Sequence, residues 1–183
     1  VQWLRDRMKF FKKAPETERI VKSLNTNNDI YLVPAFTGLG APYWNANARG
    51  VLSGITRDTS PKEIIRATIE AVAYQTYDLF EAMKHDGLRP KLVKVDGGMV
   101  MNNWFSQFLS DVVNVNVLRP KVQETTALGA AFMAGLHIGV YKSLKDISKK
   151  WSLDRKFKPK MRNQLRNALV KGWLTAIKRA LIV

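Results

Sequence analysis

The sequence VKVDGGMVMN at residues 93–102 gives the clearest indication of fold class in this 183-residue chain. Its alternating apolar residues predict a short strand, which ends at Asp96, Gly97 and Gly98 before a helix begins near Asn102. In open α/β sheets, phosphates and other ligands bind at such places, because strand ends and helix N-termini present free backbone N–H groups. Taken alone, Asp-Gly-Gly is equally consistent with a tight turn in which Asp96 caps the helix. The residues by themselves leave both interpretations open.

The segments around this stretch alternate between strand and helix patterns. Ser60, Pro61 and Glu63 supply an N-cap, a proline at the first helical position and a capping-box acid, which together predict a helix start. Asn102 and Asn103 predict the cap of another helix. Strands are expected at residues 30–33, 51–55, 92–95 and 115–118, and helices within residues 1–24, from 61, from 103, from 125 or 126, and near the C-terminus. We therefore predict one α/β domain, with a mixed sheet flanked by helices and no interior boundary.

The side-chain pattern of each helix predicts how it packs. The helix from residue 61 is apolar around much of its circumference, which predicts a core helix, and its acids Glu70, Asp78 and Glu81 are expected on the surface. The helix at residues 127–135 is rich in Ala and Gly, so we expect it to lie close against a neighbour. The basic stretch around Pro159 is expected to be a linker. The last helix is expected to pack a single apolar stripe, formed by Leu165, Leu169, Trp173, Ile177 and Leu181.

An irregular loop is expected at residues 34–44, PAFTGLGAPYW, because it contains two glycines and two prolines. Its aromatic residues Phe36, Tyr43 and Trp44 suggest a loop that is packed down by its own side chains. Two interpretations stay open for it: a surface loop held by aromatics, and a loop at a domain interface or an active-site cleft.

Composition excludes several classes of protein. The chain contains no cysteine, which excludes disulfides and thiolate metal sites, and its two histidines, His85 and His137, are far apart and are interpreted as capping or packing residues. No apolar run approaches the ~18 residues of a membrane helix, and a cytoplasmic location is expected. The net charge of +15 is concentrated after residue 141 and is interpreted as a solvated basic helix face; nucleic-acid binding is not favoured.

Three motifs, in order, resemble the glycerol kinases of the FGGY family of carbohydrate kinases. They are VPAFTGLGAPYW at residues 33–44, DGGMVMNNWFSQFLSD at 96–111 and ETTALGAAFMAG at 124–135. Residues 50–70 also fit the C-terminal signature of the family, and residues 2–6 fit the segment that precedes the loop; residues 156–183 are the least distinctive. The resemblance implies an actin-like, ribonuclease-H-like ATPase fold, with ATP and glycerol between two domains. Residues 1–183 are expected to be the C-terminal domain, without the N-terminal substrate-binding domain, and a first residue other than Met also indicates a fragment.

The resemblance implies nucleotide contacts at four residues of this chain. Gly98 and Asn102 correspond to the second glycine of the turn and the asparagine that contact the nucleotide in the family, with Gly97 supporting the turn. Gln2 corresponds to a nucleotide-contacting glutamine, and Ala14 to a small residue that lines the adenine pocket. These are predictions of ATP or ADP binding rather than of catalysis.

No catalytic or metal-binding residue is assigned to this chain. Phosphoryl transfer requires an oriented nucleophile, metal-shielded phosphates and usually a carboxylate to accept the hydroxyl proton. The resemblance puts that carboxylate, the glycerol ligands and most of the Mg²⁺ contacts in the other half, so activity of the isolated chain is not expected.

Two alternatives to a kinase half stay open, as does assembly into a homo-oligomer. In the first, the chain is a complementing subunit with an apolar surface around Phe36, Tyr43 and Trp44. In the second, it is an inactive remnant whose basic tail binds polyanions.

Overall fold

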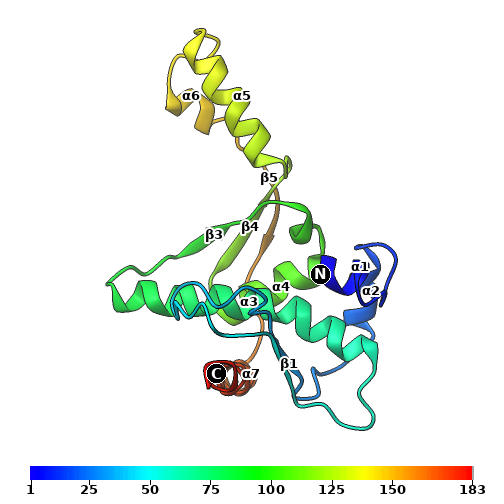
Figure 1. Cartoon of the computed structure of the whole chain (residues 1–183). Coiled ribbons are helices and arrows are strands. Elements are labelled where there is room, and N and C mark those ends of the chain that lie inside the picture. Colours follow the sequence, from blue (N-terminus) through cyan, green and yellow to red (C-terminus); the bar gives the residue numbers. More distant parts are fainter. Residues whose placement is uncertain (183) are drawn as a thin grey trace.

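The computed structural model describes residues 1–182. Helices and strands alternate along the chain, and Figure 1 shows how they are arranged. In order they are α1 (Gln2–Asp6), α2 (Glu16–Lys22), β1 (Tyr31–Val33), β2 (Val51–Ser53), α3 (Pro61–His85), β3 (Leu92–Lys94), the 3-10 helix η1 (Gly98–Met101), α4 (Asn103–Val113), β4 (Asn116–Pro120), α5 (Thr125–His137), α6 (Leu144–Ser148), β5 (Leu153–Phe157) and α7 (Asn163–Ala180).

The strands form two small sheets on opposite sides of α3 and α4. β1 pairs antiparallel with β2, whereas the other sheet has the order β3-β4-β5, with β3 parallel and β5 antiparallel to β4. The three-stranded sheet lies against one side of the α3 and α4 layer, and β1 and α7 lie against the other (Figure 1). This arrangement confirms the predicted mixed sheet flanked by helices.

Aromatic side chains fill the core between these layers. Tyr74 of α3 is buried with its ring centroid 5.3 Å from that of Trp173 in α7, 5.6 Å from Phe108 in α4 and 5.9 Å from Tyr31 in β1. α7 approaches β1 so closely that a Cβ added at Gly172 would lie 2.2 Å from Tyr31 Oη. Tyr74 therefore connects α3 to α4, β1 and α7.

The helix starts at Ser60 and Asn102 are confirmed. The Ser60 side chain accepts from the backbone N–H of Lys62, and the Glu63 side chain accepts from the Ser60 N–H at 3.0 Å, which completes a capping box. Asn102 Oδ1 accepts from the Phe105 N–H at 2.9 Å. The helix at residues 125–137 is confirmed, but its N-cap is Glu124, with no side-chain capping bond.

The prediction that Glu70 and Asp78 lie on the surface is wrong. Both side chains are buried, and each has a hydrogen-bond donor: Arg66 Nε lies 2.7 Å from Glu70 Oε1, and Trp173 Nε1 donates to Asp78 Oδ2 at 2.9 Å. Tyr74 Oη donates to the other oxygen of Glu70 at 3.1 Å. A buried carboxylate is stable only with such partners. Of the three acids, Glu81 alone lies at the surface, in an exposed ion pair with a lysine.

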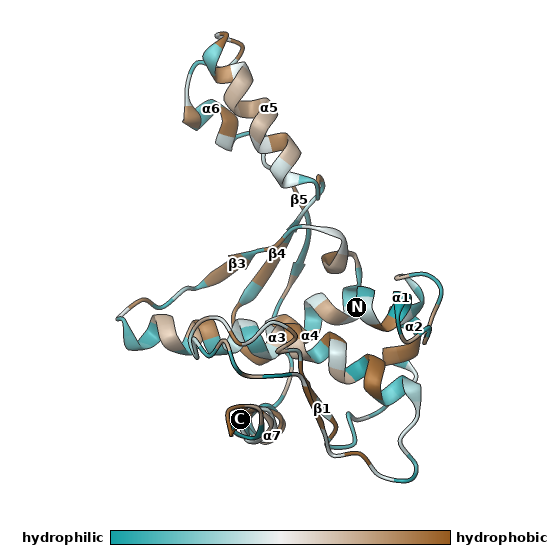
Figure 2. Ribbon diagram, viewed as in Figure 1, coloured by the Kyte–Doolittle hydropathy of each residue, from teal (hydrophilic) through white to brown (hydrophobic). Residues whose placement is uncertain are grey.

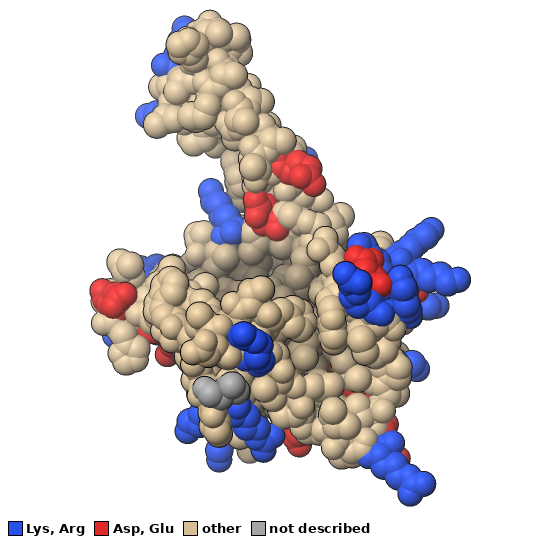
Figure 3. All heavy atoms as spheres, in the orientation of Figure 1, with Lys and Arg blue, Asp and Glu red and all other residues tan. Residues whose placement is uncertain are grey.

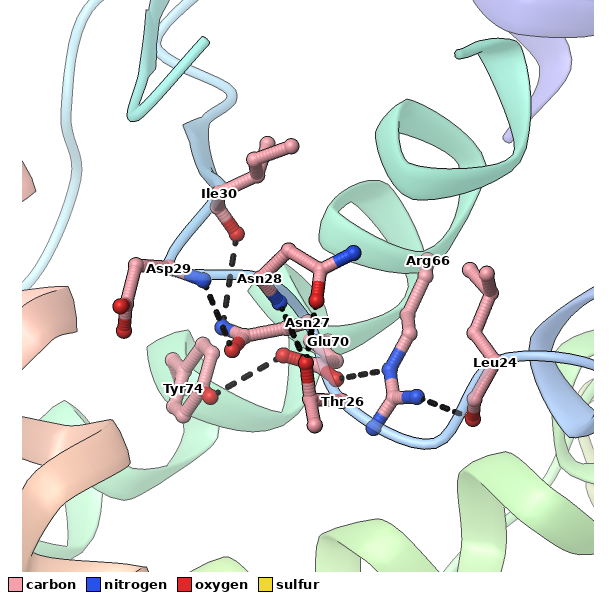
Figure 4. A network of polar contacts seen from close by, with 9 residues as sticks. All are labelled: Leu24, Thr26, Asn27, Asn28, Asp29, Ile30, Arg66, Glu70 and Tyr74. Carbon is pink, nitrogen blue, oxygen red and sulfur yellow. Dashed lines mark hydrogen bonds and ion pairs between the residues drawn. The ribbon is translucent and has the colours of Figure 1, made fainter. Parts of the chain in front are cut away.

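The Arg66 and Glu70 pair also fixes the connection between α2 and β1. Figure 4 shows residues of this connection gathered around the pair. Arg66 Nη1 donates to the Leu24 carbonyl at 2.6 Å, and the Asn27 amide reaches the Ile30 carbonyl. The network therefore holds the end of α2 against α3.

The prediction that the small-residue helix lies against a neighbour is wrong in this chain. α5 and α6 project from the main body as an arm (Figure 1), and Gly135 is the one buried residue of α5. Gly135 contacts the Tyr141 ring, which belongs to the same arm. We call residues 121–151 the arm below.

Three further differences lie in the C-terminal third. The basic stretch around Pro159, expected to be a linker, is preceded directly by β5, which was missed because four of its five residues are exposed, so it shows no buried alternation. The short helix α6 was not predicted either. β4 continues through Arg119 to Pro120. The apolar stripe of α7 drifts around the helix, because spacing of four exceeds the 3.6-residue turn, so Leu165 is exposed while Val170, Trp173, Ala176, Ile177 and Ala180 are buried.

Candidate functional site

A cleft of about 400 Å³ brings together all four residues expected to contact a ligand. Gln2 comes from α1, Ala14 from the segment just before α2, Gly98 from η1 and Asn102 from the cap of α4. Hollows of about 610 and 580 Å³ lie elsewhere on the surface, so size does not single out this cleft. What distinguishes it is that all four residues expected to contact a ligand line its walls. Its remaining walls are Val1, Arg5, Pro15, Thr17, Glu18, Ile69, Met99 and Met101.

The turn before η1 depends on Gly97 and opens onto the cleft at Gly98. Gly97 has φ 82° and ψ 173°, a conformation that side chains rarely adopt, and its N–H donates to the Gln123 carbonyl at 3.1 Å. Gly97 does not line the cleft. A Cβ at Gly98 would meet no atom within 4 Å, so the backbone there is open to close approach by a ligand.

The interpretation of Asp96 as a helix cap is wrong. Its carboxylate accepts a hydrogen bond from the Thr125 hydroxyl, at the start of α5, while Asn102 caps α4. Asp96 therefore connects the end of β3 to the arm.

A relay of hydrogen bonds holds Asn102 against the opposite wall of the cleft. Asn102 Oδ1 caps α4, and its Nδ2 lies 3.4 Å from Thr17 Oγ1. Thr17 Oγ1 in turn donates to the Ala14 carbonyl at 2.7 Å, and Thr17 is buried. Because the amide of Asn102 has two N–H donors, one stays available to a ligand. Thr17 was missed by sequence reasoning, since a threonine in the first turn of a helix is ordinary.

Charged groups of both signs border the cleft. Arg5 is paired with Asp6, with Nε and Oδ1 2.7 Å apart, and hydrogen bonding from Arg5 lowers the pKa of Asp6. Burial raises the pKa of Glu18, but hydrogen bonds from Lys22 and Asn103 outweigh it, so the pKa of Glu18 is lowered overall. Glu18 is therefore ionised at neutral pH and disfavours an anion beside it.

The aromatic loop at residues 34–44 is partly packed and partly exposed. Ala35 and Leu39 are buried, and the Phe36 ring lies 5.2 Å from that of Trp3. Trp44 is 79% exposed, whereas Tyr43 packs against the main core. The loop is thus anchored to the body, while Trp44 and about half of Phe36 remain exposed to solvent.

Residues 1–182 contain neither a candidate metal cluster nor a helix that could span a membrane. No three His, Asp or Glu side chains gather there into a group that could hold a metal ion. Among the same residues, no helix combines the length and apolar character needed to cross a bilayer. His85 and His137 lie in the last turns of α3 and α5, and neither lines the cleft.

Comparisons with known proteins agree with this arrangement. The family described as the FGGY family of carbohydrate kinases, C-terminal domain, matches residues 1–138. Glycerol kinase 1 of Pseudomonas aeruginosa is 52% identical over 179 residues, which cover 98% of this chain and 36% of that protein. The glycerol kinase of Alkaliphilus oremlandii is 50% identical over 182 residues, covering 99% of this chain and 36% of that protein. The chain therefore spans about a third of the length of these relatives.

Solved structures show the same fold. The glycerol kinase of Plasmodium falciparum with ADP superimposes with a TM-score of 0.87 at 33% identity, covering 100% of this chain and 37% of that one. A ligand-bound xylulose kinase of Lactobacillus acidophilus gives a TM-score of 0.76 at 23% identity, covering 97% of this chain and 36% of that one. These likenesses confirm the expected actin-like, ribonuclease-H-like ATPase fold.

Proposed function

Since the chain belongs to the FGGY family of carbohydrate kinases, we propose that it is the C-terminal, nucleotide-binding half of a glycerol kinase. The complete enzyme would transfer a phosphoryl group from ATP to glycerol. Residues 1–183 would supply the C-terminal domain, and a separate N-terminal substrate-binding domain would supply the rest.

The observation that carries this proposal is the convergence of Gln2, Ala14, Gly98 and Asn102 on one cleft. The four residues were predicted from motifs up to 100 positions apart, and the fold brings them to a single cavity. A related glycerol kinase of known structure contains ADP. A nucleotide is therefore the ligand that agrees both with the residues of the cleft and with the ligand of this related structure.

The charges and shapes of the walls suggest how the nucleotide would lie. Gly98 presents open backbone, which suits phosphate oxygens, because an N–H without a side chain beside it can approach an anion closely. The carboxylate of Glu18 would repel phosphate, so the base and ribose would lie toward Ala14 and Glu18. The available N–H of Asn102, between these ends, would donate to the nucleotide.

This chain would contribute binding and orientation to the reaction. Holding ATP rigidly lowers the entropic part of the barrier to phosphoryl transfer. The carboxylate that accepts the glycerol proton, and most of the contacts to Mg²⁺, are expected from the N-terminal half. Glycerol would accordingly bind only when both halves are present.

Direct nucleotide binding tests the proposal. A Cβ at Gly98 would meet no protein atom within 4 Å, so Gly98→Leu would add a side chain at the cleft wall without a clash at its Cβ; we expect at least a tenfold loss of affinity for a fluorescent ADP analogue, with an unchanged Tm. Gly40→Leu is the matched control, because a Cβ there also meets open space but lies outside the cleft. Equal affinity of Gly98→Leu and the unaltered chain would contradict the proposed nucleotide site.

A further inference from the structure

A second cavity lies where α4 and α7 meet the connection between α2 and β1. Its volume is about 580 Å³, and it shares no lining residue with the proposed nucleotide cleft. Pockets that bind small molecules typically have volumes of about 300–1,000 Å³ and combine a mostly apolar lining with a few polar groups. The cavity falls within this range of sizes, and the proposed function gives it no role.

The cavity has an apolar side and a polar side. On the apolar side, the rings of Trp104 and Phe108 from α4 are stacked, with centroids 5.0 Å apart and planes at 8°. Leu165 and Leu169 of α7 add aliphatic side chains there. The polar side is formed by the connection at residues 25–29, which Figure 2 colours teal before the brown strand β1. A ligand with an apolar body and polar ends would match both sides.

Arg66 brings an incompletely bonded guanidinium group to the wall of the cavity. The residue is 8% exposed, and its Cζ lies 5.1 Å from the centroid of the Trp104 ring. Nε is bonded to Glu70 and Nη1 to the Leu24 carbonyl, whereas Nη2 has no hydrogen-bond partner within residues 1–182 (Figure 4). Protein does not enclose Nη2, since among these residues Arg166 Nη1 is the one fully buried side-chain atom without a partner. Arg66 Nη2 is therefore free to donate to a ligand.

Asp111 supplies a free acceptor at the other end of the cavity. Its Oδ1 accepts from the Gln107 amide at 3.1 Å and from the backbone N–H groups of Lys160 and Met161. Its Oδ2 accepts no hydrogen bond within residues 1–182, and protein does not enclose this atom either. Trp104, beside the guanidinium, and Asp111 are seven residues apart on α4, or about 10 Å along the helix axis. The donor and the acceptor are thus separated by roughly the length of one substituted ring.

The charges of the walls favour an uncharged ligand. Within residues 1–182, Arg66 is the only Lys or Arg that lines the cavity, and its charge is already paired with Glu70. Figure 3 shows Lys and Arg gathered elsewhere, on the surface around α1. Asp29 and Asp111 add two carboxyl groups to the walls, so an anion would be repelled. An ammonium ion, in turn, has no acceptor to offer Arg66 Nη2.

We propose that this cavity is a second small-molecule site, which binds an uncharged aromatic compound with a carbonyl group at one end and a hydroxyl group at the other. The carbonyl oxygen accepts from Arg66 Nη2, the hydroxyl donates to Asp111 Oδ2, and the ring packs against Trp104 and Leu169. The site does not depend on the proposed function, because it uses none of the residues of the nucleotide cleft.

Titration with 4-hydroxybenzamide, followed by NMR at the indole N–H of Trp104, tests the site in the 183-residue chain. We expect a saturable shift of this signal. Benzamide lacks the hydroxyl donor and phenol lacks the carbonyl acceptor, so each should bind at least fivefold more weakly. The anion 4-hydroxybenzoate should also bind at least fivefold more weakly, because it brings a negative charge to walls that already contain two carboxyl groups.

A pair of substitutions in α7 locates the binding. Ala168 is an exposed wall residue of the cavity, so Ala168→Phe would fill part of it, and we expect at least tenfold weaker binding of 4-hydroxybenzamide. Thr175→Phe is the control, because it adds the same ring at an exposed position of α7 outside the cavity; we expect a change of less than twofold. A saturating concentration of ADP should leave the binding of 4-hydroxybenzamide unchanged.

Several results would overturn the proposal. An unshifted Trp104 signal, full affinity in Ala168→Phe, or displacement of 4-hydroxybenzamide by ADP would each contradict a separate site in this cavity. Equal affinity for 4-hydroxybenzamide and 4-hydroxybenzoate would contradict the uncharged class of ligand. Equal affinity for 4-hydroxybenzamide and benzamide would contradict the hydrogen bond to Asp111.

Discussion

Breaking the buried ion pair in α3 should be among the most destabilising single changes in the main body. Glu70 is fully buried, and Arg66 is its only cationic hydrogen-bond partner within residues 1–182, with Nε and Oε1 2.7 Å apart. Arg66→Met would keep most of the side-chain volume but leave the carboxylate without its cation. Removing one partner of a buried pair typically costs about 3–5 kcal/mol. We expect a loss of that size in urea unfolding followed by tryptophan fluorescence.

A second substitution separates the charge from the packing. Glu70→Gln removes the buried charge and keeps an oxygen that can accept from Tyr74, so Arg66→Met with Glu70→Gln should recover most of the loss. Recovery is expected because paired apolar or neutral replacements of buried ion pairs are often well tolerated. A loss below about 1 kcal/mol for Arg66→Met alone, or no recovery in the double variant, would refute this reasoning.

The pH dependence of Arg66→Met follows from the same carboxyl. Burial raises the pKa of Glu70, and Arg66 opposes that rise. Without Arg66 the pKa of Glu70 rises further, so the folded state binds a proton more tightly than the unfolded state does. The stabilisation that comes from the protonated Glu70 carboxyl is then fully present at acidic pH and is lost as the pH rises through the pKa of Glu70 in the folded state. Arg66→Met should therefore be less destabilised at pH 5 than at pH 8.

Three further results are expected. Thr17→Val should weaken ADP binding several-fold by breaking the hydroxyl relay to Asn102, with affinity restored in Thr17→Ser; equal affinities for the Val and Ser variants would exclude a positioning role. Gly172→Ala should lower the Tm by several degrees because its Cβ would collide with Tyr31, and an unchanged Tm would contradict the close packing of α7 on β1. Burial raises the pKa of Asp78 to about 6; its contribution to stability is therefore lost as the pH rises through that value, and Asp78→Asn should flatten the dependence of urea midpoints on pH between 5 and 8.

Local signals were sufficient for the helix starts at Ser60 and Asn102 and for the glycine turn at the cleft. The Ser60 capping box and the Asn102 cap involve residues within three positions of each other, and the φ of 82° at Gly97 is a property of glycine itself. Gln2 and Ala14, by contrast, were assigned through resemblance, because nothing in their neighbourhood indicates a ligand. Their meeting with Asn102 depends on tertiary packing.

The missed features depend on distant partners. Asp78 is buried because Trp173, 95 positions away, supplies its donor, and no pattern within α3 shows this. β5 escapes detection because the sheet leaves its charged side chains in solvent. The small residues of α5 predict a helix that lies close against a neighbour, yet α5 projects from the main body, because a sequence pattern does not show whether the same chain supplies that neighbour.

Glycerol-dependent release of ADP from Mg-ATP tests the proposed function most directly. The purified chain would be assayed alone and with the N-terminal half of a related glycerol kinase. We expect turnover only when both halves are present, because under the proposed function the cleft of this chain would supply nucleotide contacts and the other half would supply the groups that act on glycerol. Turnover by the chain alone would contradict that division of roles, and absence of turnover with both halves would contradict the assignment of this chain as a functional kinase half.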